Sequence, residues 1–121
     1  GVIYAPDKQR AGVYGTAQQM AACLTNRQIA TWVTPTGADD HRPRFVPADF
    51  VRNPAGSLYS LSKEGANTAG PLVTALTAEV AEAAEEHAAA SPGGRLPTPL
   101  LAVLDEAANV CRWRELGVFP K

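Results

Sequence analysis

Residues 99–109 read Pro-Leu-Leu-Ala-Val-Leu-Asp-Glu-Ala-Ala-Asn, and this stretch decides the fold that the sequence predicts. An apolar run from Leu100 to Leu104 ends abruptly in two acids, Asp105 and Glu106. An apolar run of this length, bounded by proline, is typical of a buried central strand in a parallel sheet. Ligands bind at the carboxyl ends of such strands. The two acids are therefore predicted to lie at a ligand site.

This arrangement is that of a Walker B element. In it the first acid, here Asp105, holds Mg²⁺ through water, and the metal bridges the phosphates of a nucleotide. The second acid, Glu106, orients or deprotonates the attacking water. The same residues also fit a strand that feeds a helix, with Asp105 as N-cap and Glu106 in the first turn. So short a motif does not by itself separate the two interpretations.

Length and composition indicate one modest globular domain. The chain has 121 residues and a formal net charge of −1, so it lacks the excess of basic residues that would indicate nucleic-acid binding. Its two cysteines, Cys23 and Cys111, are far apart and lack metal-ligand spacing. We expect them to be cytosolic thiols and not a disulfide. No apolar run approaches the length of a membrane-spanning helix.

The amino-terminal third is predicted to be a small helical hairpin. Residues 14–24 place apolar side chains at spacings of three and four. A second short helix over residues 27–32 follows, with Thr25 or Asn26 as its cap and Trp32 buried. Residues 38–47 are polar and punctuated by proline, which predicts an exposed loop. One helical turn is expected over 47–51, before a turn at 53–56.

The central part predicts a strand, a loop and a helix. Residues 57–62 alternate with period two, which indicates a strand. The loop 63–70 contains glycines and Lys63, but the lysine precedes the last glycine, so this is no P-loop. Two interpretations stay open: a tight strand-to-helix turn, or a loop at a nucleotide-binding edge with Lys63 near a phosphate or a neighbouring subunit.

A long helix is predicted from Pro71 to about Ala90. Proline suits the first helical position because its missing N–H costs nothing there. An apolar stripe and a solvated acidic face follow the helical period: Leu72, Val73, Leu76, Val80 and Ala83 against Glu79, Glu82, Glu85 and Glu86. Residues 91–94 stop the helix. The predicted order is a strand at 57–62, the long helix, and a buried strand at 100–104. This order predicts a right-handed βαβ unit with parallel strands.

Four stretches together resemble the type IV secretion coupling ATPases of actinobacterial type. These are TraG/TraD-like conjugative DNA-transfer proteins, relatives of the FtsK-like DNA pumps. The resemblance spans about residues 14–116. The stretches are Tyr14–Ala17, Phe45–Val51, Leu61–Thr77 (interrupted at residues 66–68) and Leu104–Val110. The strongest parts are residues 62–77 and 100–109, and their order is more specific than either part alone.

The resemblance implies an α/β fold, namely part of a RecA-like P-loop NTPase core. Residues 1–52 would be a helical segment bordering the family's all-helical insertion, and residues 53–121 the partial motor core. It also implies ATP and Mg²⁺ as cofactors. By position, Asp105 is the Mg²⁺-associated acid, Glu106 the catalytic acid, and Lys63 a nucleotide-edge residue. The parent would be a hexamer under the inner membrane that moves DNA or a relaxase–DNA complex to the secretion channel.

The chain also departs from the family. It contains no Gly-x-x-x-x-Gly-Lys-Ser/Thr motif and no membrane-spanning helices, and the match stops near Leu116. We therefore expect a fragment that binds ATP poorly and hydrolyses none when alone, and that is monomeric or prone to aggregate.

The alternative is a non-enzymatic module that recognises relaxosome proteins or single-stranded DNA through Arg112, Trp113 and Arg114. Those three residues equally fit a packed tryptophan between solvated arginines. A weaker alternative is another RecA-like motor, such as a chromosome-partitioning translocase.

Overall fold

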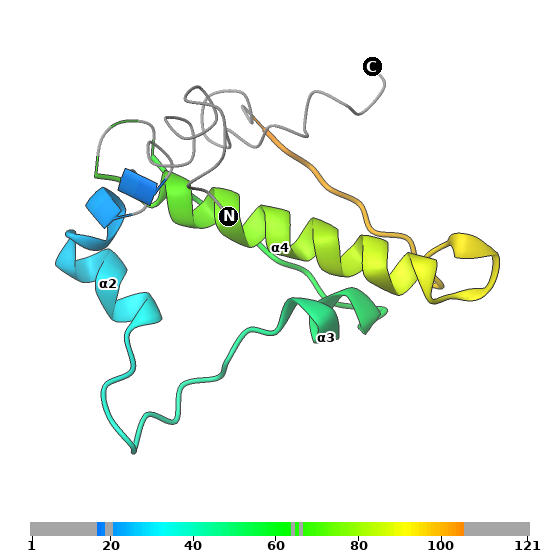
Figure 1. The fold of residues 1–121 in the computed structure, drawn as a ribbon, viewed down its shortest axis with the longest axis horizontal. Coiled ribbons are helices and arrows are strands. Elements are labelled where there is room, and N and C mark those ends of the chain that lie inside the picture. The colour runs from blue at the N-terminus through cyan, green and yellow to red at the C-terminus, as the bar shows by residue number, and fades with distance from the viewer. Residues whose placement is uncertain (1–16, 19–20, 64, 66, 106–121) are drawn as a thin grey trace, which may run out of the picture.

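The fold is built around one long helix. The computed structural model describes residues 17–18, 21–63, 65 and 67–105. Residues 17–18 and 21–24 are helical. They are followed by α2 (Arg27–Val33), α3 (Pro47–Arg52), α4 (Gly70–Ala89) and a 3₁₀ turn, η2 (Pro92–Gly94). Figure 1 shows α2 near the amino-terminal end of α4 and α3 alongside the same helix.

Local sequence signals set both ends of α4. Pro71 lies in its first turn, where no N–H is needed. The helix then runs through alanine-rich sequence, which favours helix over any other backbone state. It ends at Ala89, and Gly93 beyond it adopts a positive φ of 75°, a conformation that glycine reaches without steric cost. The predicted helix and its stop at residues 91–94 are confirmed.

Two small apolar clusters hold the short helices on α4. Val51 of α3 packs with Val80 and Ala84 of α4, and Phe50, Leu76, Ala83 and Leu96 surround them. Near the other end of α4, Cys23 and Ile29 pack with Ala69, against Leu72 and Val73. The four glutamates of the predicted acidic face are exposed. The predicted division of α4 into an apolar stripe and a solvated face is therefore confirmed.

The short helix α2 forms as predicted, but it buries a different side chain. Asn26 is its N-cap, and the Asn26 side chain accepts a hydrogen bond from the Gln28 N–H at 3.0 Å. The prediction that Trp32 is buried is wrong, because its side chain is 61% exposed. Ile29, one turn earlier, occupies the buried position instead. The helical turn at 47–51 is confirmed by α3, and residues 38–46 form the expected exposed loop.

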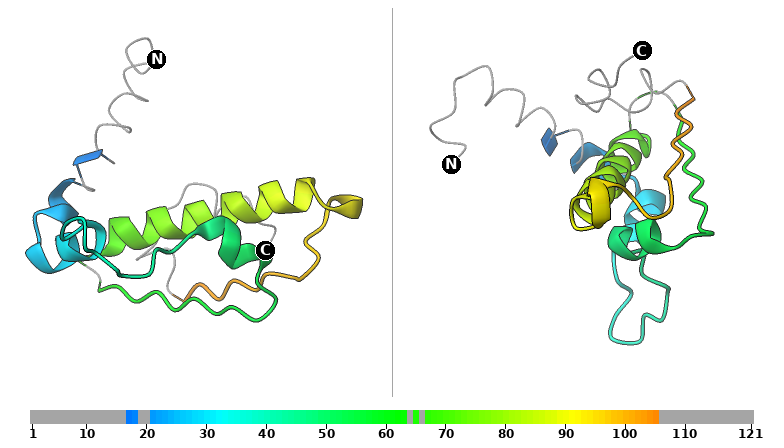
Figure 2. Two further views of the ribbon diagram at one scale, coloured as in Figure 1. Left: turned by 90° about the horizontal axis from the view of Figure 1, so that it is seen from below. Right: turned by 90° about the vertical axis from the view of Figure 1, so that its right-hand side faces the viewer.

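The predicted α/β fold is wrong for the part of the chain that the structure describes. Residues 57–63 and 99–104 form no strand, and no backbone hydrogen bond between described residues joins the two segments. Both are extended and lie on the same side of α4, where each runs toward the amino-terminal end of that helix (Figure 2). The direction of a parallel pair is present, but the ladder that would make a sheet is not. The RecA-like βαβ core is therefore not formed among these residues.

The physical reason lies in what surrounds the apolar run. Leu101 and Val103 are 85% and 81% exposed, so the run is not a buried central strand. A parallel pair of strands is stable only inside a larger sheet that is covered on both faces. Among the described residues, α4 covers one side of the two segments, and no further strand is present to extend them into a sheet. The segments therefore stay extended and unpaired.

Replacing Leu101 with serine tests this correction directly. A leucine in a buried strand would cost about 2–5 kcal/mol when truncated. At an exposed position we expect a change within about 0.5 kcal/mol. Urea unfolding followed by circular dichroism measures the difference, with Leu76→Ser in the α3–α4 cluster as the destabilised comparison. A loss of stability in Leu101→Ser as large as in Leu76→Ser would contradict the exposed placement.

Candidate functional site

The first candidate site lies where the two extended segments end. Lys63 closes the first segment and Asp105 follows the second, and both side chains are exposed. Figure 2 shows the two segments ending toward the same end of the molecule, that of the α4 amino terminus. The two segments that carry these residues therefore run in the same direction along α4. The structure corrects the prediction that Asp105 sits at the tip of a buried strand, because Asp105 lies in a turn after an exposed run.

The loop between Lys63 and α4 is tightly turned. Asn67 adopts a left-handed φ of 56°, and the Thr68 hydroxyl donates a hydrogen bond of 3.0 Å to the Gly65 carbonyl. The Asn26 side-chain amide donates to the Asn67 carbonyl at 3.5 Å, which ties the loop to the cap of α2. The cap of α4, Ala69, makes no side-chain hydrogen bond, and the first turn holds no acid. The N–H groups in the first turn of a helix and the side chain of a lysine are groups that attract anions.

The remaining predicted site residues cannot be placed in this geometry. Glu106, the predicted catalytic acid, lies outside the described residues. The same holds for Arg112, Trp113 and Arg114, the predicted partner or DNA contacts, and for Cys111. Among the residues that the structure does describe, no group of three or more His, Cys, Asp or Glu side chains is arranged to hold a metal ion. The assignments of these residues stay predictions.

The second candidate is a shallow pocket at the carboxyl end of α2. Thr31, Thr36, Asp39, Asp40, His41 and Arg42 line it. The Arg42 guanidinium donates hydrogen bonds to the backbone carbonyls of Thr31 and Thr34, the latter at 2.8 Å. These carbonyls belong to the last turn of α2 and its cap, which have no helical partner of their own. A cation from the following loop thus satisfies the negative end of a helix that carries no basic residue in its last turn.

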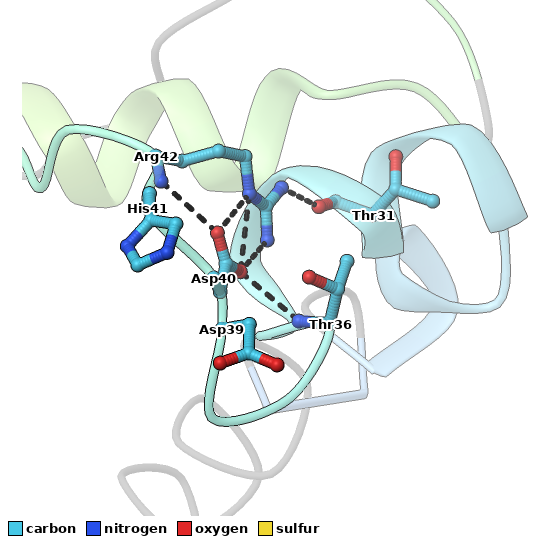
Figure 3. Close-up of a pocket in the computed structure, with 6 residues that line it drawn as sticks. All are labelled: Thr31, Thr36, Asp39, Asp40, His41 and Arg42. Atoms are coloured by element: carbon cyan, nitrogen blue, oxygen red, sulfur yellow. Dashed lines mark hydrogen bonds and ion pairs between the residues drawn. The ribbon is translucent and has the colours of Figure 1, made fainter.

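Asp40 fixes the orientation of Arg42. One Asp40 carboxylate oxygen accepts from Arg42 Nε at 2.9 Å, and the other pairs with the Nη2 group (Figure 3). The same carboxylate accepts the Thr36 and Arg42 backbone N–H groups at 3.0 and 3.1 Å. These bonds, above all those from the Arg42 side chain, hold the pKa of Asp40 well below its usual range. The pKa of Arg42 is raised, chiefly by the hydrogen bonds to Asp40.

This Asp40–Arg42 clamp is a structural lock. The Arg42 guanidinium donates hydrogen bonds to two backbone carbonyls and to the Asp40 carboxylate. These N–H groups are therefore engaged within the chain and are not directed at a ligand. Figure 3 shows the side chains of Asp39 and His41 outside the hydrogen-bonded network. The sequence predicted only an exposed loop at these residues. The overlooked signal is an acid two residues before an arginine, in the loop that follows a short helix whose last turn holds no basic residue.

Removing the clamp is expected to loosen the loop and leave the helices in place. In Arg42→Ala, residues 34–42 should exchange their amide hydrogens faster, because the α2 carbonyls and the Asp40 carboxylate lose their donor. The pKa of Asp40 should rise toward the ordinary value for an aspartate of about 3.9. In the wild type, the depressed pKa means that the clamp is intact above that ordinary value and is lost as the pH falls through the lower, folded-state pKa. Carboxyl NMR titration and hydrogen exchange measure both effects.

Arg44→Ala is the matched control for that experiment, since Arg44 lies in the same loop and is exposed. It should leave the exchange rates of residues 34–42 and the Asp40 titration unchanged. Equal effects in the two variants would contradict the specific role given to Arg42.

Comparison with known proteins adds no further constraint on either candidate. The chain matches no protein-family model, no curated protein and no solved structure. In the described residues no helix is both long and apolar enough to cross a membrane.

Proposed function

We propose that this chain is a segment of a conjugative DNA-transfer coupling ATPase and that it contributes Asp105 and Glu106 to a Mg²⁺–ATP site. The site is completed by a phosphate-binding loop on another segment, since this chain has no Walker A motif. Alone, the chain is expected to bind ATP poorly and to hydrolyse none.

One observation supports the proposal most. Lys63 ends the first extended segment and Asp105 follows the second, and both segments run toward the amino-terminal end of α4, whose cap, Ala69, makes no side-chain hydrogen bond. A lysine and a helix amino terminus favour phosphate, and a carboxylate favours Mg²⁺. The exposure of Lys63 and Asp105 leaves both side chains free to meet a nucleotide held by a second segment.

The proposal implies the cofactors, assembly and partners of the family. The complete protein would use ATP and Mg²⁺, assemble as a hexamer at the cytoplasmic face of the membrane, and act on DNA with relaxosome proteins and the secretion channel. In such a motor the metal neutralises charge that develops on the phosphates during transfer. Asp105 would hold that metal through water, and Lys63 would lie near a phosphate or a neighbouring subunit.

Joining this chain to an upstream segment with a Walker A motif tests the proposal. We expect the joined protein to hydrolyse ATP in the presence of Mg²⁺, and the Asp105→Asn variant to need a higher Mg²⁺ concentration for half-maximal turnover. Asp49→Asn, on an exposed position of α3, is the matched control. A joined protein that hydrolyses ATP with the same Mg²⁺ dependence in the wild type and in Asp105→Asn would refute the role of Asp105. A joined protein that is folded but binds no ATP would refute the function itself.

A further inference from the structure

We draw no further inference here: the strongest candidate, the exposed apolar side chains of Tyr59, Leu61, Leu101 and Val103 on the two extended segments beside α4, carries none because nothing in the described part of the chain shows what covers them.

Discussion

Replacing Val80 with aspartate is expected to unfold the chain. Val80 is buried against Val51 and Ala84, in the cluster that joins α3 to α4. The surrounding side chains are apolar: Phe50, Leu76, Ala83 and Leu96. A carboxylate there has no partner, and an unpaired buried charge costs at least about 3 kcal/mol. A domain of this size is stabilised by only about 5–15 kcal/mol in total, and its clusters are small. Circular dichroism at increasing temperature should show a large drop in the melting temperature or no folded baseline.

The pH dependence of that variant separates charge burial from a simple loss of volume. Burial raises the pKa of a carboxyl, so the folded state binds its proton more tightly than the unfolded state does. The penalty should therefore lessen as the pH falls toward the ordinary aspartate pKa of about 3.9. Val80→Ala removes volume without charge, and its smaller penalty should not follow this trend. Glu82→Asp places an aspartate on the exposed face of the same helix and should change stability by no more than about 0.5 kcal/mol. If the melting temperature of Val80→Asp equals that of Glu82→Asp, the packing of α4 on α3 is contradicted.

The helices could be predicted because their signals are local. Asn26 caps α2, Pro71 opens α4, and the glycines after Pro92 end the helical region. Each of these acts through its own backbone or that of its neighbours. The helical period also identified which side chains of α4 meet the rest of the fold. For these elements, sequence and structure agree because no distant partner is needed.

The sheet could not be predicted correctly because strands depend on partners. An apolar run such as Leu100–Leu104 indicates that burial would be favourable, but it does not say which segment provides it. The structure leaves that run extended, and no ladder is formed among the described residues. Trp32 is a related case, since helical spacing placed it near the buried face and Ile29 took that position. The Asp40–Arg42 clamp was overlooked for the opposite reason, because its geometry comes from a loop that folds back onto α2.

If the joined protein hydrolyses ATP as proposed, replacing Glu106 with glutamine is expected to abolish turnover while ATP still binds. Glutamine keeps the size of glutamate and its carbonyl oxygen, but it cannot take a proton from the attacking water. The loss of a general base lowers the rate by about 10²–10⁴-fold. Steady-state hydrolysis should fall by at least about 100-fold, and equilibrium binding of a non-hydrolysable ATP analogue should be unchanged. Glu85→Gln removes one carboxylate from the exposed face of α4 and should leave both measurements alone.

The exposure of Asp105 makes this test sharper than it would be in a buried motif. Acids at the tip of a central strand also support the fold, so a loss of activity in their variants mixes chemistry with stability. Asp105 lies in an exposed turn, and its replacement by asparagine should leave the melting temperature of the isolated chain unchanged. A fall in turnover of the joined Asp105→Asn protein, without a fall in stability of the isolated variant, would then report on metal binding itself. Turnover of Glu106→Gln that equals the wild type would show that the adjacent acid takes no part in the reaction.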